Sequence, residues 1–268
     1  TNIHFGETDM RTQPQDVIAK LEADNSRLAK EKILLDAMNE GLDEFFEGLK
    51  MCLDKLYTFG VKQVPTKDEV VAGQGCPWNV FKDLAEKLYN RELTGHNARD
   101  AINLVMSSAT AEQWNGFYRR ILIKDLRCGV SEKTVNSVAK KNKFGKYMVP
   151  VFTCQLAHDS ANHEKKLVGK KMLEVKLDGV RTLAIVHPDG KVDMLSRNGK
   201  EFTNFGHIQD EISAVVKQDP PPYPLVLDGE VMSENFQDLM KQVHRKGSAD
   251  AKDAVLHLFD FIPLEEFK

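Results

Sequence analysis

Residues 174–182 read EVKLDGVRT and place a lysine, an aspartate and an arginine around one tight turn. The flanking runs Met172–Lys176 and Val180–Val186 are rich in β-forming residues, and Asp178-Gly179 is a dipeptide typical of two-residue hairpin turns. The pattern therefore predicts a β-hairpin with these runs as its arms. Lys176 is then either a solvated edge residue or one of three charged groups that converge on a phosphate, and the surrounding sequence must decide between them.

The bulk composition describes a globular protein with room for two domains. The chain has 268 residues, of which 41% are hydrophobic and 29% charged. No segment approaches the ~20 apolar residues that span a bilayer, and the first residues lack a signal-peptide pattern. The four cysteines form no CxxC pair that could hold zinc. We expect a protein of the reducing cytoplasm, or of the host-cell cytoplasm if it is viral, without a membrane partner.

Positive charge is concentrated in one part of the chain. Residues 119–147 contain nine Lys/Arg and two Asp/Glu, a net charge of +7. The remainder, from totals of 37 and 40, has 28 basic and 38 acidic residues, a net charge of −10. Segregated charge of this kind is typical of a phosphate-binding surface. A solvated basic helix face is the alternative.

Hydrophobic periodicity divides the chain near residue 148 and predicts an α+β protein. Residues 14–147 show the spacing of three and four that is typical of helices, so domain 1–147 is expected to be all-helical. Domain 148–268 is expected to be β-rich and mainly antiparallel, with helices at 205–217 and 233–247. Its strands are expected at 172–176, 180–187, 191–196, 225–232 and 255–262.

Further motifs follow EVKLDGVR in a fixed order. They are MLSRNG at 194–199, LVLDGEVM at 225–232 and HLFDF at 257–261. This ordered set resembles the nucleotidyltransferase motifs of ATP-dependent DNA ligases. RELTGHNARDAI at 91–102 and FYRRILIKDLRCGVSEKTVN at 117–136 resemble the helical DNA-binding domain of these ligases, closest to the T-even bacteriophage type. The resemblance implies a DNA-binding domain at 1–147 and an ATP-grasp-like adenylation domain at 148–268.

The resemblance also implies a role for each residue that matches a family motif. Lys176 matches the catalytic nucleophile that accepts AMP from ATP. The other implied roles are adenine recognition by Glu174, nucleotide-sugar binding by Arg181, binding of the nucleotide or a 5′-phosphate by Arg197, ribose and metal binding by Glu230, and base stacking by Phe259.

The chemistry requires an unprotonated amine at Lys176. At an unperturbed pKa of about 10.4, only about one lysine in 2,500 is free base at pH 7. Partial burial in the predicted hairpin and positive charge from Arg181 and Mg²⁺ are expected to lower the pKa.

The implied enzyme uses ATP and Mg²⁺ and acts as a monomer on nicked double-stranded DNA. We expect three basic residues of the helical domain to bind the DNA backbone: Lys124, Arg127 and Lys133. The family continues with a Glu-Gly strand, a Lys-x-Lys motif and an OB-fold that are absent from this sequence, so we interpret the chain as a fragment. The alternatives are an RNA ligase or capping guanylyltransferase, and a nick-binding module without chemistry of its own.

Overall fold

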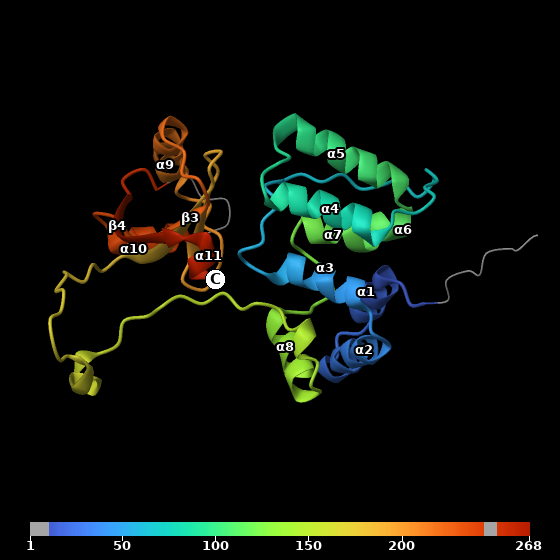
Figure 1. Cartoon of the computed structure of the whole chain (residues 1–268), viewed down its shortest axis with the longest axis horizontal. Coiled ribbons are helices and arrows are strands. Elements are labelled where there is room, and N and C mark those ends of the chain that lie inside the picture. The colour runs from blue at the N-terminus through green and yellow to red at the C-terminus, as the bar shows by residue number, and fades with distance from the viewer. Residues whose placement is uncertain (1–10, 244–250) are drawn as a thin grey trace, which may run out of the picture. The chain divides into compact units, whose positions relative to one another are not determined.

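The computed structural model describes residues 11–243 and 251–268 (Figure 1). The chain forms two compact units, Thr1–Val151 and Phe152–Lys268.

The described part of the first unit is helical where it has regular structure. Its long helices are α1 (Pro14–Ala23), α2 (Arg27–Glu40), α3 (Asp43–Leu53), α4 (Trp78–Tyr89), α5 (Gly95–Ser108) and α8 (Glu132–Lys141). A π-helical turn, η1 (Trp114–Tyr118), joins the short helices α6 (Ala111–Gln113) and α7 (Arg119–Leu122). A 3-10 turn, η2 (Gly145–Tyr147), follows α8.

Local sequence signals set several of these helix ends. Ser26 caps α2, because its hydroxyl accepts a hydrogen bond from the Ala29 amide at 3.2 Å. Gly41 ends α2 with a φ of 72°, a left-handed conformation that glycine adopts without strain.

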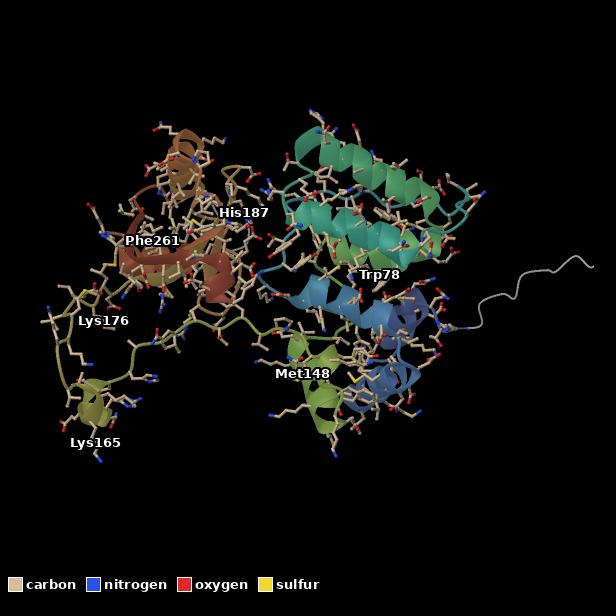
Figure 2. All side chains as sticks on the ribbon, in the orientation of Figure 1. Trp78, Met148, Lys165, Lys176, His187 and Phe261 are labelled. Atoms are coloured by element: carbon tan, nitrogen blue, oxygen red, sulfur yellow. The ribbon has the colours of Figure 1, made fainter. Side chains whose placement is uncertain are left out.

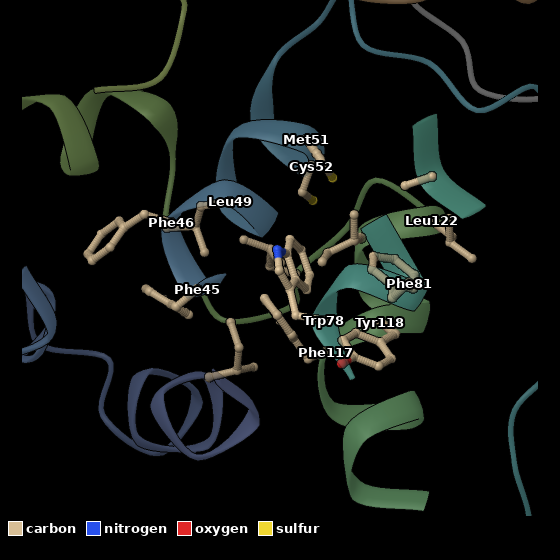
Figure 3. Packing of buried hydrophobic residues seen from close by; sticks show 14 of the residues in the cluster. Phe45, Phe46, Leu49, Met51, Cys52, Trp78, Phe81, Phe117, Tyr118 and Leu122 are labelled. Carbon is tan, nitrogen blue, oxygen red and sulfur yellow. The ribbon is translucent and has the colours of Figure 1, made fainter. Parts of the chain in front are cut away.

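Aromatic side chains fill the core of the first unit (Figure 3). Phe81 and Tyr118 stack with ring centroids 4.3 Å apart, and Trp78 lies 5.8 Å from Phe117. Gly48 of α3 is required here, because a Cβ atom at this position would lie 2.4 Å from the Phe117 ring. Close packing of this quality makes the first unit a folded body with its own core.

The described part of the second unit is built on an antiparallel sheet of order β2-β1-β3-β4. Its strands are β1 (Val180–Val186), β2 (Val192–Ser196), β3 (Leu225–Met232) and β4 (Val255–Pro263). Its helices are α9 (Gly206–Gln218), α10 (Phe236–Val243) and α11 (Leu264–Phe267), and two 3-10 turns, η3 (Ser160–Asn162) and η4 (Glu164–Lys166), precede the sheet. The chain is therefore an α+β protein.

The two faces of the sheet have different roles. Ala184, Met194 and Val231 are buried in one cluster with residues of α9 and α10, so these helices cover one face. Side chains alternate along a strand, so Arg181 projects from the opposite face, beside its partner Glu230 in the register of β1 and β3.

The predicted hairpin arm at 172–176 is wrong, because these residues form no strand. The reason lies in the topology: β2 and β3 already pair with β1 on its two sides, so a chain that turns back at Asp178-Gly179 finds no free edge of β1. Met172, Leu173 and Val175 are consequently 83%, 98% and 86% exposed. The other four predicted strands are present, with ends that differ by at most one residue.

The helix predicted at 205–217 is present as α9, one residue later at each end. The helix predicted at 233–247 is shorter at its start, since α10 begins at Phe236 and the Asn235 side chain accepts from the Asp238 amide at 3.2 Å. Residues 244–247 of that prediction lie outside the described residues.

Candidate functional site

Arg181 is held in one orientation by a carboxylate on the neighbouring strand. Its Nε and Nη2 donate to the two carboxylate oxygens of Asp228 at 2.6 Å each, and its Nη1 donates to the Gln155 carbonyl oxygen at 3.1 Å. The Arg181 and Asp228 side chains are only 21% and 20% exposed. The hydrogen bonds to Asp228 raise the pKa of Arg181, so the guanidinium remains charged.

Phe259 lies on the same face because β4 carries a β-bulge. Gly229 pairs with Leu258 and Asp228 pairs with Asp260, which leaves Phe259 as the extra residue between two pairs. The Arg181 Cζ atom lies 5.4 Å from the centroid of the Phe259 ring, within the range of a cation–π contact. Phe259 remains 47% exposed, so part of its ring is open to a ligand.

A backbone hydrogen bond ties the Asp178-Gly179 turn to β3. The Gly179 amide donates to Glu230 Oε1 at 3.1 Å. A Cβ atom at Gly179 would lie 2.2 Å from the Val231 carbonyl oxygen, so only glycine permits this approach. Glu230 therefore fixes the chain three residues after Lys176.

A cavity of about 410 Å³ lies beside Asp228. Its lining combines strand residues, the segment 153–155 and α11, and comprises Thr153, Cys154, Gln155, Val226, Asp228, Asp260, Phe261, Ile262, Glu266 and Phe267. Cys154 Sγ also contacts the Arg197 carbonyl oxygen at 3.5 Å, and burial raises the pKa of the Cys154 thiol. The cavity is lined by both polar and apolar groups.

Three of the predicted site residues lie outside this arrangement. Lys176, Glu174 and the Arg197 side chain are exposed, and the described residues offer them no hydrogen-bond or ion-pair partner. Figure 2 shows Lys176 on the irregular segment that precedes β1. The expectation that Lys176 is partly buried in a hairpin arm is therefore wrong.

Two partners of Arg181 were absent from the sequence-based site. Asp228 precedes Glu230 by two residues on β3, so the period-2 alternation of a strand already placed both on one face. Gln155 contributes only a backbone carbonyl, and a backbone contact leaves no signal in residue type.

Lys124 is half-buried in the first unit, and its ammonium group points inward. Its Nζ donates to the carbonyl oxygens of Met51 and Asp54 at 2.7 and 2.6 Å and also to that of Tyr57, where α3 ends. Burial lowers the pKa of Lys124 to about 8. The ammonium group thus neutralises the carboxyl-terminal end of α3, and it is not presented to a ligand at the surface.

The other two predicted DNA-contact residues are exposed. Arg127 forms a 3.6 Å ion pair with Asp125, and Lys133 lies in the first turn of α8. Ser131 caps that helix, because its hydroxyl accepts from the Thr134 amide at 3.4 Å.

Within the described residues, no three His, Cys, Asp or Glu side chains lie close enough together to hold a metal ion. Glu230, the predicted metal ligand, uses one carboxylate oxygen for the Gly179 amide. The described residues also include no helix with the length and apolar character of a membrane span.

Comparison with known proteins gives three findings. Residues 153–268 match the family model described as "ATP dependent DNA ligase domain". The chain is 26% identical over 151 residues to the DNA ligases of Enterobacteria phages T4 and T6, a match that covers 54% of this chain and 30% of each phage protein. It is 63% identical to two solved structures, Pmar-Lig_Pre and Pmar-Lig_PreS3, with a TM-score of 0.57, covering 96% of this chain and 58% and 59% of theirs.

Proposed function

Because residues 153–268 match the family model described as "ATP dependent DNA ligase domain", in agreement with the sequence motifs, we propose that the chain is part of an enzyme that seals nicks in duplex DNA. The chain spans 30% of the length of the phage ligases that it matches, so we assign this activity to the whole protein that contains it. The carrying observation is that Arg181 lies beside Phe259 and Glu230 on one face of the sheet, and that Glu230 also accepts a hydrogen bond from the Gly179 amide, three residues after Lys176.

The nucleotide binds at the sheet face that carries Arg181. A guanidinium has five N–H donors, and Asp228 and Gln155 take three of them, which leaves two for a sugar hydroxyl. The exposed part of the Phe259 ring offers a stacking surface for adenine. The adjacent cavity of about 410 Å³ falls within the range of small-ligand pockets, about 300 to 1,000 Å³.

Lys176 performs the first chemical step. Its unprotonated amine attacks the α-phosphorus of ATP, a phosphoramidate bond forms, and pyrophosphate leaves. The AMP then passes to the 5′-phosphate of the nick, and the 3′-hydroxyl attacks that phosphate and releases AMP. By resemblance, Glu174 recognises the adenine amine, and Arg197 binds the nucleotide or the 5′-phosphate, which suits its paired donors.

ATP fits the groups present on this face, whereas a resident metal site does not. The described residues provide Glu230 as the one carboxylate assigned to Mg²⁺, and Mg²⁺ commonly binds through one or two carboxylates together with substrate phosphates. We therefore assign Mg²⁺ to the ATP phosphates and derive no step through it.

The helical unit supplies the grip on DNA. Residues 1–147 form the DNA-binding domain, residues 148–268 are the incomplete adenylation domain, and the enzyme acts as a monomer. Arg127 and Lys133 remain as phosphate contacts because both are exposed on the basic part of the chain. Lys124 is removed from this set because its donors are used by backbone carbonyls.

The test is the mass of the complete protein after incubation with ATP and Mg²⁺. We expect one AMP moiety on Lys176, lost in Lys176→Arg because arginine does not deprotonate, and retained in the matched neighbour variant Lys171→Arg. Sealing of a nicked duplex without this adduct, or an adduct on another lysine, would contradict the proposal. Replacing ATP by GTP and the DNA nick by an RNA nick separates the capping and RNA-ligase alternatives.

A further inference from the structure

Two pairs of lysines lie on the segment that leads to Lys176. Residues 165–173 read KKLVGKKML, and we call them the lysine-pair segment. The segment contains four lysines and no acidic residue. Lys165, Lys166, Lys170 and Lys171 are all exposed, and within the described part of the chain their ammonium groups make no ion pair or hydrogen bond. Figure 2 shows Lys165 in the short helical turn η4 at the start of this segment.

Apolar side chains alternate with these lysines and are also uncovered. Leu167, Val168, Met172 and Leu173 are 56%, 72%, 83% and 98% exposed. An ordinary solvated loop carries polar residues at such positions. The segment has no strand partner, and its four lysines outnumber the two carboxylates that flank it, Glu164 and Glu174, so it is suited to order against a large anionic partner.

The position of the segment in the chain identifies this partner under the proposed function. Lys171 lies five residues before Lys176, which is a span of at most about 17 Å in extended chain. Along one strand of duplex DNA this distance covers about five phosphates at about 3.4 Å each. A nick whose 5′-phosphate approaches Lys176 therefore brings neighbouring backbone phosphates within reach of Lys170 and Lys171, and Lys165 and Lys166 can meet phosphates further along the same strand.

We propose that the lysine-pair segment is a DNA contact of the second unit, separate from the helical unit, and that its four lysines bind backbone phosphates next to the nick. This inference rests on the proposed function. The contact is electrostatic and carries no sequence information, which suits an enzyme that must act at any nick. The exposed apolar side chains cover the sugar-phosphate surface between the lysines.

The test compares two matched lysine pairs in the complete protein. Lys170→Gln/Lys171→Gln removes one pair of the segment, and Lys217→Gln/Lys252→Gln removes two exposed lysines elsewhere in the second unit. Affinity for a nicked duplex is measured by fluorescence anisotropy at several salt concentrations. The segment variant is expected to lose about 1.8 from the slope of log K against log salt, and up to about 60-fold in affinity at 0.1 M salt. The control variant keeps the slope of the unmodified protein.

Two further measurements, of adenylylation and of vesicle binding, distinguish a failure of this inference from a failure of the proposed function. Adenylylation of Lys176 requires no DNA, so the segment variant is expected to form the AMP adduct normally. A normal adduct with an unchanged salt slope overturns the inference alone, whereas the absence of any adduct in the unmodified protein overturns the proposed function. Loss of binding to anionic lipid vesicles, with DNA binding intact, would also overturn the inference.

Discussion

Replacing Asp228 by asparagine removes the carboxylate that orients Arg181 and should destabilise the second unit. The two hydrogen bonds of 2.6 Å are charge-assisted, a class that contributes about 1.5 to 3 kcal/mol each. Asparagine keeps one acceptor and turns a donor toward the guanidinium, so about one bond is lost and a positive charge is left about four-fifths buried. We expect the free energy of unfolding to fall by about 2 to 3 kcal/mol.

Urea unfolding can isolate this effect because both tryptophans, Trp78 and Trp114, lie in the first unit. Tryptophan fluorescence then reports unfolding of the first unit alone, whereas circular dichroism reports both units. A change in circular dichroism that occurs without a change in fluorescence therefore reports unfolding of the second unit. A double-mutant cycle with Arg181→Gln should give a coupling energy of at least about 1 kcal/mol. Additivity of the two substitutions within about 0.5 kcal/mol would refute the claim that the pair acts as one element.

The same substitution should slow adenylylation of Lys176 at temperatures where the variant is folded. A loss of about 2 to 3 kcal/mol in the orientation of Arg181 corresponds to about 30- to 150-fold in rate. Asp193→Asn is the control, because Asp193 pairs with His187 and Lys191 on the same sheet, away from the Asp178-Gly179 turn. Equal loss of adenylylation in both variants would show that the effect is general to the sheet and is not transmitted by Arg181.

Three further predictions concern single positions. Gly179→Ala forces a Cβ atom against the Val231 carbonyl oxygen and should slow adenylylation about 100-fold with little change in circular dichroism; an unaffected rate would contradict the role of the turn. Lys124→Met leaves three carbonyls without a donor and should lower the urea stability seen by tryptophan fluorescence by about 2 to 4 kcal/mol, without changing the salt slope of DNA binding. Burial raises the pKa of Asp193, but the hydrogen bond from His187 and the charge of Lys191 together lower it by more. The pKa of Asp193 in the folded protein is therefore below its value in the unfolded chain. Its stabilisation is therefore complete above about pH 4 and lost as pH falls below that value, so the stability difference between the unmodified protein and Asp193→Asn should shrink in acid unfolding curves.

The sequence predicted the α+β class and the four strands of the sheet because each signal was local. Side chains alternate along a strand with a period of two, so Leu183 and Ile185 lie on one face of β1 regardless of which strands pair with β1. The arm at 172–176 has the same β-forming composition, but a strand also needs a free edge to pair with, and that depends on which strands flank β1. Strand propensity is local, whereas sheet order is set by the whole unit.

The same distinction between local and non-local signals separates Arg181, Glu230 and Phe259 from Lys124. Arg181, Glu230 and Phe259 meet because strand register and one bulge bring three motifs to one face. Lys124 was assigned to DNA from its place in a basic run, but charge along the sequence does not reveal where an ammonium group points. It follows Leu122, where α7 ends, with a φ of 57°, and this turn directs it toward the carbonyls that end α3.

The ion pair between Arg181 and Asp228 limits the positive charge that this arginine presents to its surroundings. An amine is deprotonated more easily when it is buried or when positive charge lies near it. Arg181 was expected to provide the positive charge, but its guanidinium is paired with both carboxylate oxygens of Asp228, and the pair presents a dipole and not a net charge. Arg181 therefore serves the site through the direction of its two remaining donors, which Asp228 and Gln155 leave free.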